Sequence, residues 1–132
     1  MAALTDARKS ALAKEIRDCF DWQSLFTIMV QWQGEQFPGG TAASGAKHLL
    51  KEANELVVDS TDIVEWADAM HLVIQGASRT LAGRFPDFFF VVREKLMENV
   101  ERDWQEPDAD GVVEHYRGIS SEPPKDWENP FS

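Results

Sequence analysis

Two pairs of acidic residues on two successive helical patterns constrain this chain more than any other feature. Glu52 and Glu55 form the first pair, and Glu65 and Asp68 form the second. A spacing of i, i+3 turns a helix by about 300°, so the two carboxylates of each pair share one face. If the two helices face each other, four negative charges meet in a small volume, and cations have to relieve their repulsion. The pattern therefore predicts two facing helices that hold a metal site.

Apolar residues at helical spacing extend on both sides of the acidic pairs and predict an all-α fold. The first expected helix begins at Asp6 and is capped by Thr5, and the second runs from Trp22 to the break at Phe37. Three further helices are expected over about residues 45–58, 63–81 and 87–104. The composition then shifts to Pro, Gly and Ser. We therefore expect a four- to five-helix domain over residues 1–104. An irregular tail, residues 105–132, would pack on that domain or on a neighbouring subunit, through Tyr116, Trp127 and Phe131.

The helix expected over residues 63–81 has two distinct sides. Polar residues and Leu72 form one stripe, and the leucine indicates that this stripe is not plain solvent-facing surface. The other side is expected to be buried and contains Ile63, Trp66, Ala67, Met70, Val73, Ile74, Ala77 and Leu81. Together with residues 88–92, these apolar faces exceed what one small bundle can cover. We therefore predict a homodimer or homotetramer, with the active site near a subunit interface.

Composition and charge exclude several classes of protein. The formal net charge of −10 argues against a nucleic-acid partner, because that affinity rests on Lys and Arg. The single cysteine, Cys19, excludes an internal disulfide and a cysteine-rich zinc site. No apolar run approaches the roughly 18 residues that span a bilayer, and charged residues interrupt the N-terminal alanines. We expect no membrane partner and a cytoplasmic location, in the host cytoplasm if the chain is phage-encoded.

The residue types around the acidic pairs indicate which ion they would hold. Carboxylate oxygens without cysteine, and with only His48 and His71 nearby, favour Mg²⁺ or Mn²⁺ over zinc or copper. Lys95, Asn99 and Arg102 lie at i, i+4 and i+7 on one helix face, a stripe suited to phosphate oxygens. The alternative is a surface stripe that pairs with Glu98 or Glu94. Metal ligands together with phosphate-binding donors are what phosphoryl transfer requires.

The order of these residues resembles that of the MazG-like all-α nucleoside triphosphate pyrophosphohydrolases. Residues 51–56 and 65–68 are similar to that family's Glu-x-x-Glu and Glu-x-x-Asp signature, and Lys95 and Asn99 follow four residues apart on the last helix. The similarity covers about residues 31–104. Within the family, residues 48–52 and 65–72 look closest to the branch that acts on purine deoxynucleotides, the dATP/dGTP pyrophosphohydrolases and the phage MazZ enzymes.

The resemblance implies an oligomeric MazG-like bundle that hydrolyses a deoxypurine triphosphate, dGTP or dATP, to the monophosphate and pyrophosphate. Glu52, Glu55, Glu65 and Asp68 would hold two or three Mg²⁺ or Mn²⁺ ions. Glu52 and Glu55 would be catalytic, with Glu52 as the general base. Lys95, Asn99 and Arg102 would bind the phosphates, and Trp32 would either stack on the base or belong to the core. Leu72 and Asp103 stand where several pyrimidine-selective relatives carry Tyr, which disfavours a pyrimidine pocket.

Two other classes of protein also fit the acidic residues. One is a ferritin-like carboxylate metalloprotein, to which Asp68-x-x-His71 would contribute. The other is a non-catalytic helical module whose acids are solvated surface, since Glu65, three residues after Asp62, also fits a helix cap.

Overall fold

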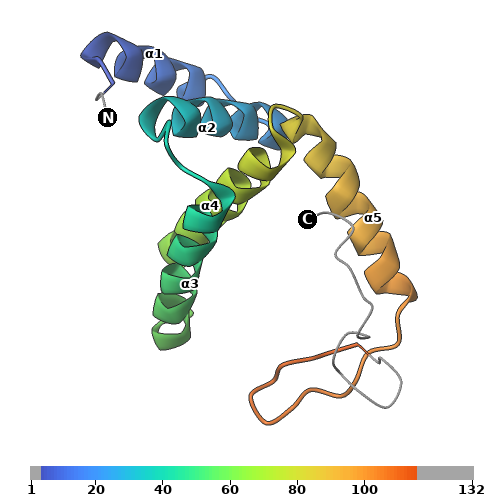
Figure 1. The fold of residues 1–132 in the computed structure, drawn as a ribbon. Helices are drawn as coiled ribbons and strands as arrows, with labels where there is room; N and C mark the ends of the chain where they lie inside the picture. The colour runs from blue at the N-terminus through green and yellow to red at the C-terminus, as the bar shows by residue number, and fades with distance from the viewer. Residues whose placement is uncertain (1–3, 116–132) are drawn as a thin grey trace. The chain divides into compact units, whose positions relative to one another are not determined.

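The computed structural model describes residues 4–115, and this part of the chain is helical apart from the connections between helices and a loop over residues 102–115 (Figure 1). The described residues contain no β-strand, and an isolated bridge joins Trp104 to His115. The expected all-α class is therefore confirmed. No helix in this range has the length and apolar character needed to cross a membrane. The helices are α1 (Asp6–Arg17), α2 (Trp22–Gln36), α3 (Ala42–Val58), α4 (Ile63–Leu81), the short 3₁₀ helix η1 (Phe85–Asp87) and α5 (Phe88–Glu101).

Side-chain caps explain where most of these helices begin. Thr5 accepts a hydrogen bond from the Arg8 N–H at 3.1 Å, which starts α1 as predicted. At α3, Thr41 and Ser44 form a capping box: Thr41 accepts from the Ser44 N–H, and Ser44 accepts from the Thr41 N–H. The helix consequently begins at Ala42, three residues earlier than expected.

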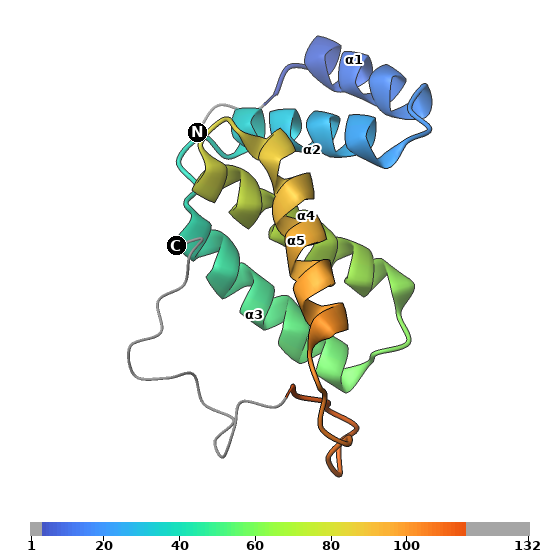
Figure 2. The same ribbon diagram turned by 90° about the vertical axis from the view of Figure 1, so that its right-hand side faces the viewer.

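Two compact units make up the chain, Met1–Phe85 and Pro86–Ser132, and each is described by itself. In the first unit α3 and α4 run antiparallel and form the most extensive helix pair, while α2 packs on α4 and α1 packs on α2 (Figure 2). The α3 and α4 backbones come close where two glycines meet. A Cβ built on Gly45 would lie 3.9 Å from Cα of Gly76.

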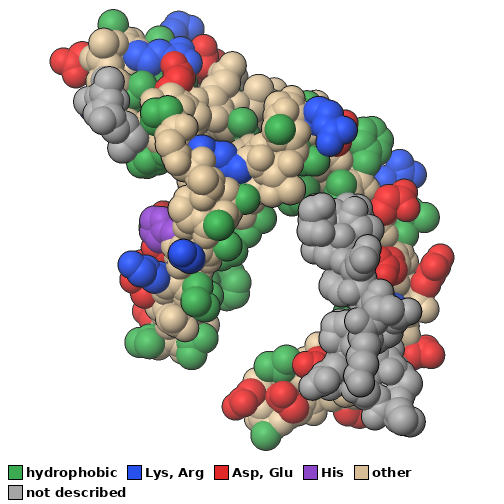
Figure 3. Space-filling view, in the orientation of Figure 1, with side chains coloured by type: hydrophobic (Ala, Val, Ile, Leu, Met, Phe, Trp, Pro, Cys, Tyr) green, Lys and Arg blue, Asp and Glu red, His purple; other side chains and the backbone are tan. Residues whose placement is uncertain are grey.

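Burial along α4 differs from the sequence-based prediction. Ile74 is 2% exposed, as expected, and Leu72 from the second stripe is also buried, at 8%. The prediction was wrong for Ile63, which is 76% exposed, and for Trp66, Met70 and Val73, which are exposed as well. Figure 3 shows hydrophobic side chains at the surface of the α3–α4 pair. The reason is that periodicity identifies the apolar side of a helix, not the neighbour that covers it, and the contacts of α4 with α2 and α3 cover only part of that side.

The described residues of the second unit comprise α5 and the loop that follows it, and the 3₁₀ helix η1 directly precedes α5. Arg102 follows α5 as its C-cap, so the helix ends three residues before the predicted Trp104. In the loop, the side chain of Asp108 accepts hydrogen bonds from the N–H groups of Asp110 and Val112 at 2.9 Å. The three aromatic residues expected to dock the tail lie outside the described residues, as does everything after residue 115.

Candidate active site

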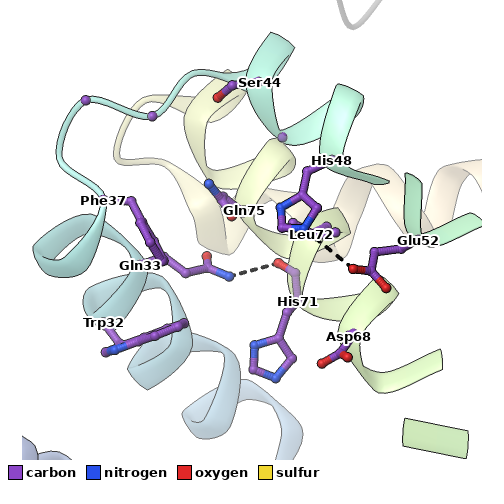
Figure 4. A pocket seen from close by; sticks show the side chains of 13 residues that line it. Trp32, Gln33, Phe37, Ser44, His48, Glu52, Asp68, His71, Leu72 and Gln75 are labelled. Carbon is purple, nitrogen blue, oxygen red and sulfur yellow. Dashed lines mark hydrogen bonds and ion pairs between the residues drawn. The ribbon is translucent and has the colours of Figure 1, made fainter. Parts of the chain in front are cut away.

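The antiparallel pairing of α3 and α4 brings acidic residues of both predicted pairs together. One carboxylate oxygen from each of Glu52, Glu55 and Glu65 lies within 4.8 Å of the other two. Asp68, the fourth predicted ligand, is not part of this cluster, but it lines the same cavity as Glu52 (Figure 4). The structure thus gathers three of the four predicted acids, with the fourth one helical turn further along α4.

The crowding of these carboxylates changes the protonation of one of them. The pKa of Glu65 rises from 4.5 to about 7 because its protonated carboxyl hydrogen-bonds Glu52, because it loses hydration, and because Glu55, Glu52 and Asp62 repel its charge. A carboxyl group with this pKa holds a proton for about half the time at pH 7. A proton therefore partly relieves the repulsion, and a divalent cation in the same place would relieve it more fully.

Glu52 shows most directly that the cluster suits a cation. Its side chain is only 16% exposed, and its Oε1 lies 3.5 Å from Nε2 of His48, one turn earlier on α3. Its other oxygen, Oε2, is buried, and no main-chain N–H, hydroxyl or basic side chain of the described residues donates a hydrogen bond to it, which leaves the carboxyl group of Glu65, when protonated, as the donor available to Glu52. A buried carboxylate oxygen without a partner is costly. Hard oxygen donors clustered in this way fit Mg²⁺ or Mn²⁺, so this glutamate cluster can bind a metal ion.

A cavity of about 640 Å³ extends from the acids toward the end of α2 (Figure 4). Trp32 stands at its wall, with its ring edge-on to Phe37 at 5.6 Å and to His71 at 6.5 Å between ring centroids. Aromatic rings beside a cluster of acids suit a ligand that has a flat apolar part and an anionic part. The lining residues are Trp32, Gln33, Phe37, Gly39, Gly40, Ser44, Gly45, His48, Glu52, Asp68, His71, Leu72 and Gln75.

Arg79 holds the wall of this cavity in place. Its guanidinium group donates to the main-chain oxygens of Gly40, of Phe37 at 2.8 Å and of Gln33 at 3.4 Å. Gln33 lies in the last turn of α2 and Phe37 is its C-cap, and their oxygens also accept from the N–H groups of Phe37 and Gly40. The contact ties the end of α2 and the following loop to α4. The sequence analysis assigned no function to Arg79.

Gln33 is a lining residue that the sequence analysis missed. It is 2% exposed, and its Nε2 donates to the main-chain oxygen of His71 at 2.8 Å. Its Oε1 is buried and makes no hydrogen bond within the described residues. The helical spacing in the sequence could have revealed it, because Gln33 follows Met29 by four residues and Val30 by three, which places it on the apolar side of α2. A polar residue at a core position requires an explanation.

The predicted phosphate-binding residues lie in the second unit, where they interact with each other and with Glu98. Lys95 Nζ lies 3.4 Å from a Glu98 carboxylate oxygen, and Arg102 forms an ion pair with the other oxygen. Arg102 also donates to Oδ1 of Asn99 at 3.3 Å. Pairing with Glu98 is the alternative that the sequence left open. Phosphate binding by Lys95, Asn99 and Arg102 therefore stays a prediction.

The all-α fold and the acidic cluster agree with the class that the sequence resembles, the MazG-like all-α pyrophosphohydrolases, which hydrolyse acid anhydrides. The family model described as dATP/dGTP pyrophosphohydrolase matches residues 25–122, about three-quarters of the chain. The chain therefore belongs to the dATP/dGTP pyrophosphohydrolase family, which favours an enzyme over the ferritin-like and non-catalytic alternatives. No curated protein and no solved structure matches it.

Proposed function

We propose that the chain hydrolyses a deoxypurine nucleoside triphosphate, dGTP or dATP, with Mg²⁺ or Mn²⁺ held by Glu52, Glu55, Glu65 and Asp68. The main support is the convergence of three carboxylate oxygens within 4.8 Å, one of which belongs to Glu52, a residue that also lines a cavity with aromatic residues in its wall. Family membership supplies the reaction: water attacks the α-phosphorus, the α–β phosphoanhydride bond breaks, and the monophosphate and pyrophosphate leave.

The acids have different tasks in this proposal. Bound divalent cations would polarise the α-phosphate and lower the pKa of a coordinated water. Glu52, whose Oε2 is buried, accepts the proton of the attacking water, and Glu55, one turn along, holds the same ion cluster. Glu65 and Asp68 complete the set of ligands from α4.

The remaining substrate contacts are assigned by the chemistry of the side chains. Trp32 stacks on the base, because its ring lines the cavity that begins at the acids. Lys95 and Arg102 neutralise the phosphate charge, and Asn99 binds a phosphate or sugar oxygen, as the family resemblance implies.

We also propose a homodimer or homotetramer in the cytoplasm, with residues 1–104 as the catalytic domain and residues 105–132 packed on it or on a neighbouring subunit. Exposed apolar residues on α3, α4 and α5, among them Val57, Ile63 and Phe89, support the assembly. Light scattering would measure its mass, and a monomer at micromolar concentration would contradict the assembly.

The test of the activity is a nucleotide panel with Mg²⁺ or Mn²⁺ and pyrophosphate as the measured product. We expect Glu55→Gln and Asp68→Asn each to reduce kcat at least about a hundredfold while the helical circular dichroism is retained. Glu15→Gln, the same change of charge at an exposed position on α1, is the matched control and should retain activity. Absence of pyrophosphate release from every common nucleotide would overturn the proposal.

A further inference from the structure

We propose that the side-chain carbonyl of Gln33 accepts a hydrogen bond from an N–H donor on the purine base, and that this bond selects amine-bearing purines. The inference rests on the proposed function, which makes a deoxypurine triphosphate the substrate. It assigns a specificity-determining role to a residue that belongs neither to the acidic cluster nor to the predicted phosphate-binding stripe.

The orientation of the Gln33 amide is set by its neighbour. The main-chain oxygen of His71 can only accept a hydrogen bond, so the amide nitrogen has to face it, at 2.8 Å. The amide oxygen then points away from His71 (Figure 4). Because this oxygen is buried without a partner, the cavity wall contains an acceptor that a donor on the ligand would satisfy.

The position of Gln33 in the cavity fits contact with a base rather than with phosphate. Glu52 and Asp68 form part of the lining, whereas Gln33 lies beside Trp32 and Phe37 at the end of α2. A nucleotide whose phosphates lie at the acids extends its base toward these rings. Arg79 bonds the main-chain oxygens of both Gln33 and Phe37 and so fixes the backbone here, while the bond to His71 fixes the Gln33 side chain.

An acceptor in this position discriminates by what the base presents to it. The adenine amino group, and the amino and ring N–H groups of guanine, are donors, whereas unsubstituted purine has no donor on that edge. A site built around a polar contact rejects a ligand that leaves the contact unpaired. In the alternative explanation, a buried water molecule donates a hydrogen bond to the Gln33 oxygen, and the amide has no effect on substrate selectivity. Gln75, on the same cavity wall and without a side-chain hydrogen bond among the described residues, is the matched control.

The experiment compares dATP with purine 2′-deoxyriboside triphosphate, which lacks the amino group. In the unsubstituted enzyme we expect kcat/KM to favour dATP by about tenfold to a hundredfold. In Gln33→Met the ratio should fall below about threefold, mainly through loss of dATP turnover, and in Gln75→Met it should persist. The same ratio should appear in dissociation constants measured by calorimetry with Ca²⁺ in place of Mg²⁺.

Equal kcat/KM for dATP and its amine-free analogue in the unsubstituted enzyme would overturn the inference, whether or not Gln33→Met folds. A ratio unchanged in a folded Gln33→Met would also overturn it and assign the amide a structural role. If the proposed function itself were wrong, the result would be distinguishable, because no nucleotide would then release pyrophosphate. The ratio of dissociation constants would still test Gln33 in that case, and equal constants would overturn the inference.

Discussion

The three-glutamate cluster predicts that the enzyme exchanges a proton for a metal ion. The pKa of Glu65 is about 7, so at pH 8 its carboxyl group is about nine-tenths ionised and at pH 6 about one-tenth ionised. Since a metal ion binds the ionised form, the apparent affinity for Mg²⁺ should fall about tenfold from pH 8 to pH 6. At pH 7 each binding event should release about half a proton from this group.

The sign of the effect on stability follows from the same shift. Because the pKa of Glu65 is raised above its ordinary value of 4.5, the folded chain retains this proton at pH values where the unfolded chain has lost it. The metal-free protein should therefore lose stability as pH rises through about 7, and its Tm should be lower at pH 8 than at pH 6. Saturating Mg²⁺ should abolish this difference, because the carboxyl group of Glu65 is then ionised in the folded chain as it is in the unfolded chain, and the gain in Mg²⁺ affinity at pH 8 offsets the loss of the proton.

Isothermal titration calorimetry in two buffers of different ionisation enthalpy measures the released proton, and repetition at pH 6, 7 and 8 measures the affinity. Glu65→Gln removes the titrating group, so its weaker Mg²⁺ binding should depend much less on pH. Identical heats in both buffers, with an affinity that does not change between pH 6 and pH 8, would refute the reasoning that these carboxylates compete with a proton.

Two further predictions concern what holds the cavity together, and both are measured by urea unfolding. Arg79→Met should lower the free energy of unfolding by about 2–4 kcal/mol, because it leaves three main-chain oxygens without their charged donor, and Arg79→Lys should recover part of the loss. Ile74→Ala should cost about 2–4 kcal/mol, because the side chain is 2% exposed, whereas Val100→Ala, at a position 77% exposed, should change stability by less than about 0.5 kcal/mol. Losses below about 0.5 kcal/mol in Arg79→Met and Ile74→Ala would contradict this account of the core.

Helix boundaries were the most predictable part of the fold because local chemistry determines them. The bounds expected for α4, residues 63–81, match the structure, and Asp62 caps the helix by accepting from the Val64 N–H at 3.0 Å. The helix ends where the backbone turns left-handed, at Ala82 with φ of 47° and at Gly83 with φ of 91°. Caps and breakers act within a few residues, so a single sequence contains all the information that they need.

Contacts between helices were predicted less well, because spacing along one helix does not determine its register against another. The i, i+3 rule correctly placed Glu52 and Glu55 on one face of α3, yet only Glu65 from α4 joins their cluster. Gln33 was missed for a related reason. Its burial depends on how α2 lies against α4, and its bond partner is a main-chain oxygen 38 residues away, which no side-chain pattern reveals.

The connection between α3 and α4 explains why acids of both helices meet despite their repulsion. Ser60 lies five residues from both Glu55 and Glu65, so in an antiparallel pair these two acids are at the same height. The connection is held by local bonds: Asp59 accepts from the Thr61 hydroxyl at 2.7 Å, and Trp66 Nε1 donates to the Ser60 main-chain oxygen at 3.0 Å. Hydrogen bonds from Thr61 also lower the pKa of Asp59, so its carboxylate stays charged and keeps accepting over the pH range in which Glu65 titrates. The turn therefore holds the helix ends together independently of the protonation of the acids, and a cation can bind a cluster that already exists.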